Sequence, residues 1–523
     1  MATHKKGYII QINASQTCAI RIFIVYLQFI CSLHSTTILF MADTTTTDNV
    51  PSAWLSLLPI TFLVALLALT IYIFGSDALG GGSQISLLIA TGVCVFIGMS
   101  ILHKPWADFE EAMVRNISGV STAIIILLII GALSGAWVVS GVVPTLIYYG
   151  IQVIHPDFFL LCTCIICAIV SVMTGSSWTT IATIGIALMG IGKAQGFSEG
   201  WIAGAIISGA YFGDKVSPLS DTTVLASSST STPLFTHIRY LMYTTVPSMV
   251  LALIIFGVAG LSHEASDTSH IVLFTDTLSA KFCITPWLLI IPIITGILIA
   301  KHVPSIITLF ISTLLAIVGA AIFQPQLLTE IAGNTDGGWT ESVKGTFTTL
   351  FGGTNLETGS AEVNDLIATR GMGGMMDTIW LILCAMCFGG AMTAGGMIDG
   401  ITRLLTRFTH HRTSMVTSTV ASGLFFNIAT ADQYISIILT GNMFKDIYRR
   451  NGYENRLLSR TTEDAVTVTS VLIPWNTCGM TQATILGVAT ITYLPYCFFN
   501  IISPLMSILV AWTGYKIIRK KNT

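Results

Sequence analysis

Charged side chains are scarce in this sequence of 523 residues. Only 10% of the residues are Asp, Glu, Lys or Arg, while 53% are hydrophobic, whereas soluble domains carry about 25% charged residues. The composition therefore excludes a soluble domain of useful size and predicts an all-α polytopic membrane protein. The net charge of −2 also gives no basic face, which excludes nucleic acid as a partner.

Clusters of cysteine and histidine with metal-ligand spacing are lacking too. Cys162, Cys164 and Cys167 lie in one apolar segment and Cys384 and Cys387 in another, without the histidines or second cysteine pair that a zinc site needs. Most of the ten histidines fall in predicted loops. The sequence therefore predicts no cofactor and no zinc or other metal cluster of this kind, and it argues against an enzyme embedded in the membrane.

Long apolar runs dominate what is present. The runs "WLSLLPITFLVALLALTIYIF" (54–74) and "STAIIILLIIGALSGAWVVSG" (121–141) reach the roughly 20 residues that span a bilayer. The first forty residues hold a run that Arg21 and His34 interrupt, and it could be a signal or an extra helix. We expect instead that translation starts at Met41.

The two halves of the chain repeat one pattern at an offset of 256 residues. "VMTGSSW" (172–178) resembles "IATADQY" (428–434), and Thr174 precedes Pro218 by 44 residues as Thr430 precedes Pro474. Such internal repeats are common in transporters. The predicted organisation is an N-terminal extension (1–53), a first repeat (54–261), a periplasmic linker (262–285), a second repeat (286–515) and a basic tail (516–523).

The distribution of Lys and Arg predicts that the repeats are inverted. The 445–460 segment carries five of these residues, while its counterpart at 193–200 carries one. Because such residues are retained on the cytoplasmic side, the halves should face opposite ways and the C-terminus should be cytoplasmic. Five crossings per half result if 158–192 and 413–444 are re-entrant hairpins and seven if they cross fully, which gives ten to fourteen membrane segments.

Two prolines predict helix breaks at membrane depth. Pro218 and Pro474 donate no backbone hydrogen bond and disfavour helix just before them. Irregular backbone in a membrane is tolerated where it lines a wet cavity, and the exposed helix ends can ligate ions. Hard cations such as Na+ take oxygen ligands. The oxygen-bearing side chains predicted to bind Na+ or H+ are Thr174, Ser176, Asp214, Ser217, Ser220, Asp221, Thr222, Asn427, Thr430, Asp432, Asn476, Thr477 and Thr481.

The charges near the breaks admit functional and plain structural interpretations. We expect Asp221 to hold Na+ or H+ in turn and Asp432 to support it, because an unpaired charge in a membrane is costly. Asp214 and Lys215 could form a neutralised interfacial pair, or Lys215 could act as a gate. Glu463 with the adjacent Asp464 could simply favour a helix N-terminus.

Three stretches carry a family resemblance. "GDKVSPLSDTTVLASS", "TADQYISIILTGNMF" and "TEDAVTVTSVLIPWN" resemble the NhaC-type sodium/proton antiporters of the ion transporter superfamily, from about residue 54 to 515, with the first forty residues outside the family pattern. The resemblance implies exchange of Na+ for H+ across a bacterial inner membrane, with two re-entrant hairpins and two broken helices. It is equally compatible with exchange of organic acids, such as malate for lactate, coupled to Na+ and H+.

An ion channel is the lower-ranked alternative, because a channel would share the polar midplane but needs no titratable group. Rigid-body movement of one repeat bundle against the other would give alternating access. The paired apolar helices at 54–102 and 286–323 are candidates for the stationary part, with a possible homodimer interface.

Overall fold

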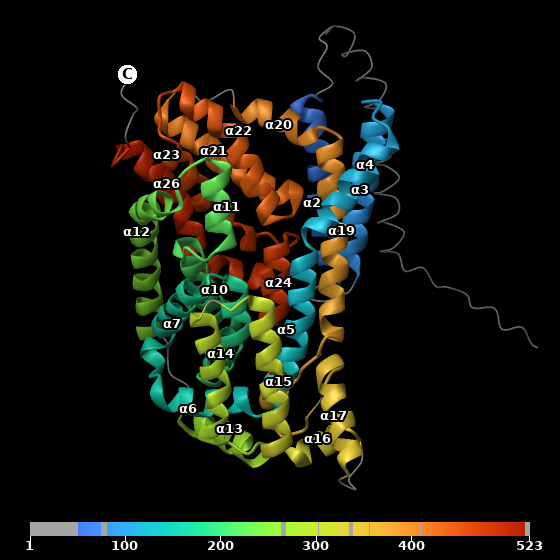
Figure 1. The fold of residues 1–523 in the computed structure, drawn as a ribbon, viewed down its shortest axis with the longest axis vertical. Coiled ribbons are helices and arrows are strands. Elements are labelled where there is room, and N and C mark those ends of the chain that lie inside the picture. The colour runs from blue at the N-terminus through green and yellow to red at the C-terminus, as the bar shows by residue number, and fades with distance from the viewer. Residues whose placement is uncertain are drawn as a thin grey trace, which may run out of the picture. The chain divides into compact units, whose positions relative to one another are not determined.

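The protein is built almost wholly from helices (Figure 1). The computed structural model describes residues 51–74, 81–262, 268–301, 303–333, 338–354, 356–406 and 411–517. Within these residues, seven helices are long and apolar enough to cross a membrane. The number of spans rises to nine if each of two bent helix pairs counts as one span. The predicted class, an all-α polytopic membrane protein, is confirmed. The expectation about Met41 and the first forty residues lies outside the described residues.

Two pairs of apolar helices open the two halves, as the sequence predicted. In the first half α2 (Ala53–Phe74) packs on α3 (Gly82–Ser100), and in the second half α14 (Ile290–Ala300) packs on α15 (Ser305–Phe323). Each pair also contacts the other half, because α3 packs on α19 (Met376–Ala394) and α15 packs on α5 (Ser121–Val139). The halves are therefore interlocked.

The remaining helices connect or cover these parts. They are α4 (Trp106–Gly119), α6 (Val142–Val153), α12 (Leu234–Leu261), α13 (Thr268–Lys281), α16 (Pro325–Ile331), α17 (Trp339–Phe351), α18 (Ala361–Ile367), α20 (Met397–Thr406), α25 (Thr490–Tyr493) and α26 (Phe498–Thr513). Figure 1 shows α6 and α13 at one end of the helical bundle and α20 and α23 (Asn455–Thr462) at the other.

Each half contains one helical hairpin. The first runs from α7 (Phe159–Thr174) through α8 (Ser177–Thr180) and a π-helical turn (Ile181–Gly185) into α9 (Ile186–Ala194). The second joins α21 (Arg412–Thr430) to α22 (Gln433–Arg450). The turns fall at Gly175 and Ala431, which both adopt left-handed backbone, with φ of 67° and 57°. A left-handed residue ends a helix abruptly, so each chain segment reverses within a few residues.

A helix in each half is interrupted at the predicted proline. In the first half α10 (Glu199–Val216) ends before Pro218, and α11 begins beyond it (Asp221–Ser229). In the second half α23 (Asn455–Thr462) passes into a π-helical turn (Glu463–Thr467) and a 3-10 turn (Ser470–Leu472), and α24 (Thr477–Leu486) follows Pro474. Helices are thus interrupted near both prolines, and the second interruption is the more irregular.

Candidate functional site

The two hairpin turns are held by the same hydroxyl contacts. Thr174 Oγ1 lies 3.2 Å from Thr180 Oγ1, and Thr430 Oγ1 lies 2.9 Å from Ser436 Oγ. Both pairs are six residues apart, and their members are separated by the 256-residue offset of the repeat. The turn threonines therefore stabilise two equivalent turns, which gives Thr174 and Thr430 a structural role.

The residue after each left-handed position caps the second arm of its hairpin. Ser176 Oγ accepts a hydrogen bond from Thr179 N at 3.2 Å, and Asp432 Oδ1 accepts one from Ile435 N at 2.9 Å. Such side chains satisfy backbone N–H groups that have no partner within the helix. Ser176 and Asp432 are thus equivalent N-caps, but only Asp432 brings a charge.

The hairpins dock on the broken helices through equivalent contacts as well. Ser171 Oγ donates to Ala210 O at 2.5 Å in the first half, and Asn427 Nδ2 donates to Val466 O at 2.8 Å in the second. Because both contacts join positions related by the 256-residue offset, the same docking is used twice. Asn427 therefore binds the broken helix of its own half.

Asp214 lies in the last turn of α10, where the first break begins, and is buried. Its carboxylate accepts hydrogen bonds from Ser177 Oγ at 2.7 Å and from Ser220 Oγ at 2.6 Å. Ser177 follows the hairpin turn and Ser220 directly precedes α11. Asp214 therefore ties the hairpin and both ends of the broken helix together through hydroxyl groups.

Glu463 comes from the second half and reaches the first break. It is fully buried in the π-helical turn after α23. Its Oε1 accepts from Thr222 Oγ1 at 3.2 Å, and its Oε2 has no hydrogen-bond partner among the described residues. The interpretation of Glu463 and Asp464 as charges at a helix N-terminus was wrong, because both follow the end of α23 inside the protein.

Lys215 pairs with Asp464, and neither side chain is exposed. Lys215 Nζ also donates to Ser503 Oγ at 2.7 Å, while Thr244 Oγ1 donates to Asp464 Oδ1 at 3.0 Å. The interpretation of Asp214 and Lys215 as a mutually neutralised interfacial pair was wrong. Adjacent residues of a helix point in directions about 100° apart, so Lys215 faces the second half while Asp214 faces its own hairpin.

A second buried cation stands beside this pair. Arg460 Nε lies 3.8 Å from Asp464 Oδ2, and the guanidinium carbon lies 4.7 Å from the centre of the Tyr240 ring. None of the three guanidinium nitrogens has a hydrogen-bond partner in the described part of the chain. Arg460 is therefore a buried donor with spare hydrogen-bonding capacity.

The buried charges of the described residues do not balance. Four are acidic and two are basic, so their formal charges sum to −2, and because both basic groups lie beside Asp464, three carboxyl groups have no basic partner at ion-pair distance among the described residues. The six are Asp214, Lys215, Asp432, Arg460, Glu463 and Asp464. Since an isolated buried charge is very costly, protons or small cations must neutralise the excess.

The second break surrounds Asp432 with polar groups. Thr477 Oγ1 donates to Asp432 Oδ2 at 3.3 Å, and Asn476 Nδ2 donates to Asn427 O at 3.0 Å. Thr481 Oγ1 is buried and has no hydrogen-bond partner among the described residues. The predicted residues of the second half are thus brought together around the hairpin turn.

Asp221 and Ser217 lie apart from the Asp214 carboxylate. Asp221 is the first residue of α11 and is exposed, whereas its neighbours Ser220 and Thr222 point into the protein. Ser217 Oγ donates to the backbone carbonyl of Val172 at 2.9 Å, which fastens the break to the hairpin. The structure does not bring Asp221 into contact with Asp432.

Sequence reasoning missed several residues of this site. Ser177, Thr244, Arg460 and Ser503 were not singled out. For Ser177 the sequence held a signal, because the repeat-related position is also polar and holds Gln433. In the structure Ser470 Oγ donates to Gln433 at 3.2 Å, which is the counterpart of the contact between Ser177 and Asp214. The other three lie far apart in the sequence and offered no pattern.

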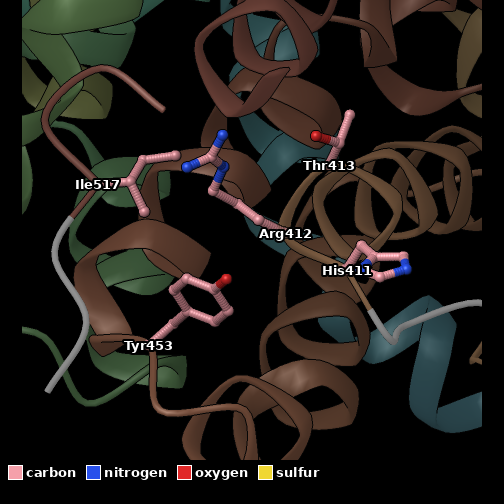
Figure 2. Close-up of a pocket in the computed structure, with 5 residues that line it drawn as sticks. All are labelled: His411, Arg412, Thr413, Tyr453 and Ile517. Atoms are coloured by element: carbon pink, nitrogen blue, oxygen red, sulfur yellow. The ribbon is translucent and has the colours of Figure 1, made fainter. Parts of the chain in front are cut away.

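A hollow of about 360 Å³ is lined by none of these residues. Figure 2 shows the five side chains that line it, which are His411, Arg412, Thr413, Tyr453 and Ile517. Arg412 Nε donates to Ala511 O at 2.6 Å at the end of α26, so this arginine serves to hold α21 against α26.

Three relatives show what the chain resembles. A model described as the Na+/H+ antiporter family matches residues 9–228 and 209–515. The "Na(+)/H(+) antiporter NhaC" of Alkalihalophilus pseudofirmus is 38% identical over 81% of this chain and 89% of that protein. The "Malate-2H(+)/Na(+)-lactate antiporter" of Bacillus subtilis is 35% identical over 84% and 91%, and the "Na(+)/H(+) antiporter NhaC" of Bacillus subtilis is 35% identical over 78% and 87%.

These matches confirm the resemblance that the three stretches carry. The family match begins at residue 9, so the expectation that the first forty residues lie outside the family pattern was wrong.

Proposed function

The chain belongs to the Na+/H+ antiporter family, and from this premise we propose that it exchanges Na+ for H+ by secondary transport. The observation that carries the proposal is the excess of acidic over basic side chains among the buried residues. Two uncompensated negative charges beside hydroxyl groups favour small monovalent cations, because carboxylate and hydroxyl oxygens are the ligands that Na+ prefers.

Competition for the same carboxyl groups accounts for the exchange. A carboxylate withdrawn from water binds a proton more tightly, and a nearby Na+ opposes protonation. Asp214 and Glu463 fit this role best, since both are buried, neither has a basic partner at ion-pair distance among the described residues, and hydroxyl groups link the two. Asp221, at the exposed start of α11, acts as an entry group that attracts cations to the break.

The transport cycle requires that the site open alternately to the two sides. The repeated turn contacts and docking contacts support two copies of one structural unit. With inverted copies, movement of the hairpins and broken helices against the α2–α3 and α14–α15 pairs exposes the site in turn. The membrane is the bacterial cytoplasmic membrane, with the C-terminus on the cytoplasmic side.

Exchange of an organic acid coupled to Na+ and H+ is the second candidate. One relative bears the name of a malate and lactate antiporter. The buried Arg460 guanidinium, whose nitrogens lack hydrogen-bond partners in the described residues, favours this candidate, because such a group can bind a carboxylate through two parallel hydrogen bonds.

Transport measurements on the purified protein in liposomes distinguish these functions. A Na+ gradient should drive proton movement with no organic acid present, and we expect Asp214→Asn to abolish it while Asp221→Asn weakens it. If proton movement requires malate and lactate, the second candidate is correct, and Arg460→Lys should then impair it. Sodium flux without any proton movement would indicate a channel and would contradict both exchange functions.

A further inference from the structure

Four side chains at the first break form one continuous hydrogen-bonded chain between two carboxyl groups. Ser220 Oγ lies 2.6 Å from Asp214 Oδ1 and 2.9 Å from Thr222 Oγ1, and Thr222 Oγ1 lies 3.2 Å from Glu463 Oε1. All four side chains are buried. The chain begins on the first half of the protein and ends on the second.

The number of protons in this chain is fixed by its contacts. Three oxygen-to-oxygen contacts need one proton each, but the hydroxyl groups of Ser220 and Thr222 carry only one proton apiece. If both carboxyl groups were ionised, the two hydroxyl protons would point outward to them, and two lone pairs would face each other between Ser220 and Thr222. A third proton, carried by Asp214 or Glu463, satisfies every contact.

We propose that Asp214, Ser220, Thr222 and Glu463 share one proton, and that Glu463 is a carrier of the transported H+. This inference rests on the proposed Na+/H+ exchange and names the group that holds the proton. With the proton on Glu463, Thr222 donates to Ser220 and Ser220 donates to ionised Asp214. With the proton on Asp214, all three hydrogen bonds point the other way.

Interconversion of the two states moves three protons, and each proton crosses one hydrogen bond. No other bond is broken. Glu463 gives its proton to Thr222, Thr222 gives its own to Ser220, and Ser220 gives its own to Asp214. The negative charge thereby passes from Asp214 to Glu463. When the shared proton leaves to water, both carboxylates are ionised, and a Na+ among the four oxygen-bearing side chains restores the lost positive charge.

The charged groups around the hydrogen-bonded chain do not form ion pairs with its two carboxyl groups, so they do not prevent the proton from passing between Asp214 and Glu463. Lys215 faces Asp464, which is the residue after Glu463, and Arg460 stands on the other side of Asp464. Asp221 follows Ser220 in the sequence and is exposed. The two cations are thus engaged with Asp464, and no basic side chain of the described residues lies at ion-pair distance from Asp214 or Glu463.

Infrared difference spectroscopy of the purified protein tests the shared proton without requiring transport. Addition of NaCl should remove the carbonyl band of one protonated carboxyl group and release one proton, measured with a pH-sensitive dye. In Glu463→Gln and Asp214→Asn the new amide supplies the missing hydrogen-bond donor, so band loss and proton release should both disappear. Choline chloride should leave the wild-type band in place.

Interruption of the chain provides a second test that keeps both carboxyl groups. Thr222→Val should slow Na+/H+ exchange in liposomes by about tenfold or more, because a hydrogen bond to a charged group is lost. Thr222→Ser retains the hydroxyl and should retain the rate. Ser227→Ala is the matched control, since Ser227 lies on the same helix and, within the described residues, its hydroxyl is seen to donate only to Val224 O.

The outcomes separate this inference from the proposed function. A Na+-sensitive band that survives in both Glu463→Gln and Asp214→Asn would overturn the shared proton, as would wild-type exchange by Thr222→Val, even if the wild type exchanges Na+ for H+. Conversely, a wild type that fails to exchange the two ions refutes the proposed function, while the Na+-dependent spectrum still decides where the proton lies.

Discussion

Lys215 and Asp464 form an ion pair that joins the two halves of the protein, with both side chains fully buried. The two residues are separated by 249 positions in the sequence. Thr244 and Ser503 add hydroxyl contacts from α12 and α26. The pair therefore fixes the first broken helix to the π-helical turn that carries Glu463.

Removal of the lysine should be strongly destabilising. Among the described basic residues, Lys215→Met leaves Asp464 only the more distant Arg460, and loss of one partner of a buried pair costs about 3–5 kcal/mol. We expect a marked fall in the thermal unfolding temperature in detergent, largely restored in the Lys215→Met, Asp464→Asn double variant. Lys193→Met is the control, because its pair with Glu199 is partly exposed and contributes at most about 1 kcal/mol. Equal losses in the two single variants would contradict this prediction.

The affinity for Na+ should depend on the charge of Asp432 and not on its role as an N-cap. Asp432→Ser reproduces the equivalent residue of the first turn, Ser176, and Ser is as good an N-cap as Asp. We expect unchanged unfolding temperature but an affinity for Na+ reduced about tenfold or more, measured by calorimetry, because a charged ligand is lost. Reduced stability with unchanged Na+ affinity would identify Asp432 as a cap only.

Glycine should be more stable than alanine at both left-handed turn positions. Gly175→Ala places a Cβ 2.7 Å from the backbone of Leu219 at a φ of 67°, so we expect a loss of about 2 kcal/mol or more. Ala431→Gly removes the strain of a φ of 57° and should leave stability unchanged or raise it by up to about 1 kcal/mol. Chemical unfolding of both variants measures the difference, and a destabilised Ala431→Gly variant would be inconsistent with it.

The two loops with unequal numbers of basic residues should lie on opposite sides of the membrane. Ser198 and Asn451 are exposed, so cysteines placed there should react with an impermeant reagent from the periplasmic and the cytoplasmic side respectively. The exposed native Cys283 must first be replaced. Labelling of both positions from one side would rule out inverted repeats.

The local features of this protein could be predicted from the sequence because they depend on neighbouring residues. Pro218 and Pro474 disfavour helix just before them, since proline lacks a backbone N–H and its ring crowds the preceding residue. The turn contacts of Thr174 and Thr430 span only six residues. The hairpin turns, the helix interruptions and the membrane class follow from such short-range patterns and from composition.

Only the tertiary structure decided which charged groups meet. Asp214 and Lys215 are adjacent, yet the first binds hydroxyls of its own half and the second binds Asp464 of the other. Glu463 looked like a helix-end charge in the sequence and proved to be the far end of a chain that starts at Asp214. The direction in which a helical side chain points is local, but the group that it finds there depends on how the two halves pack.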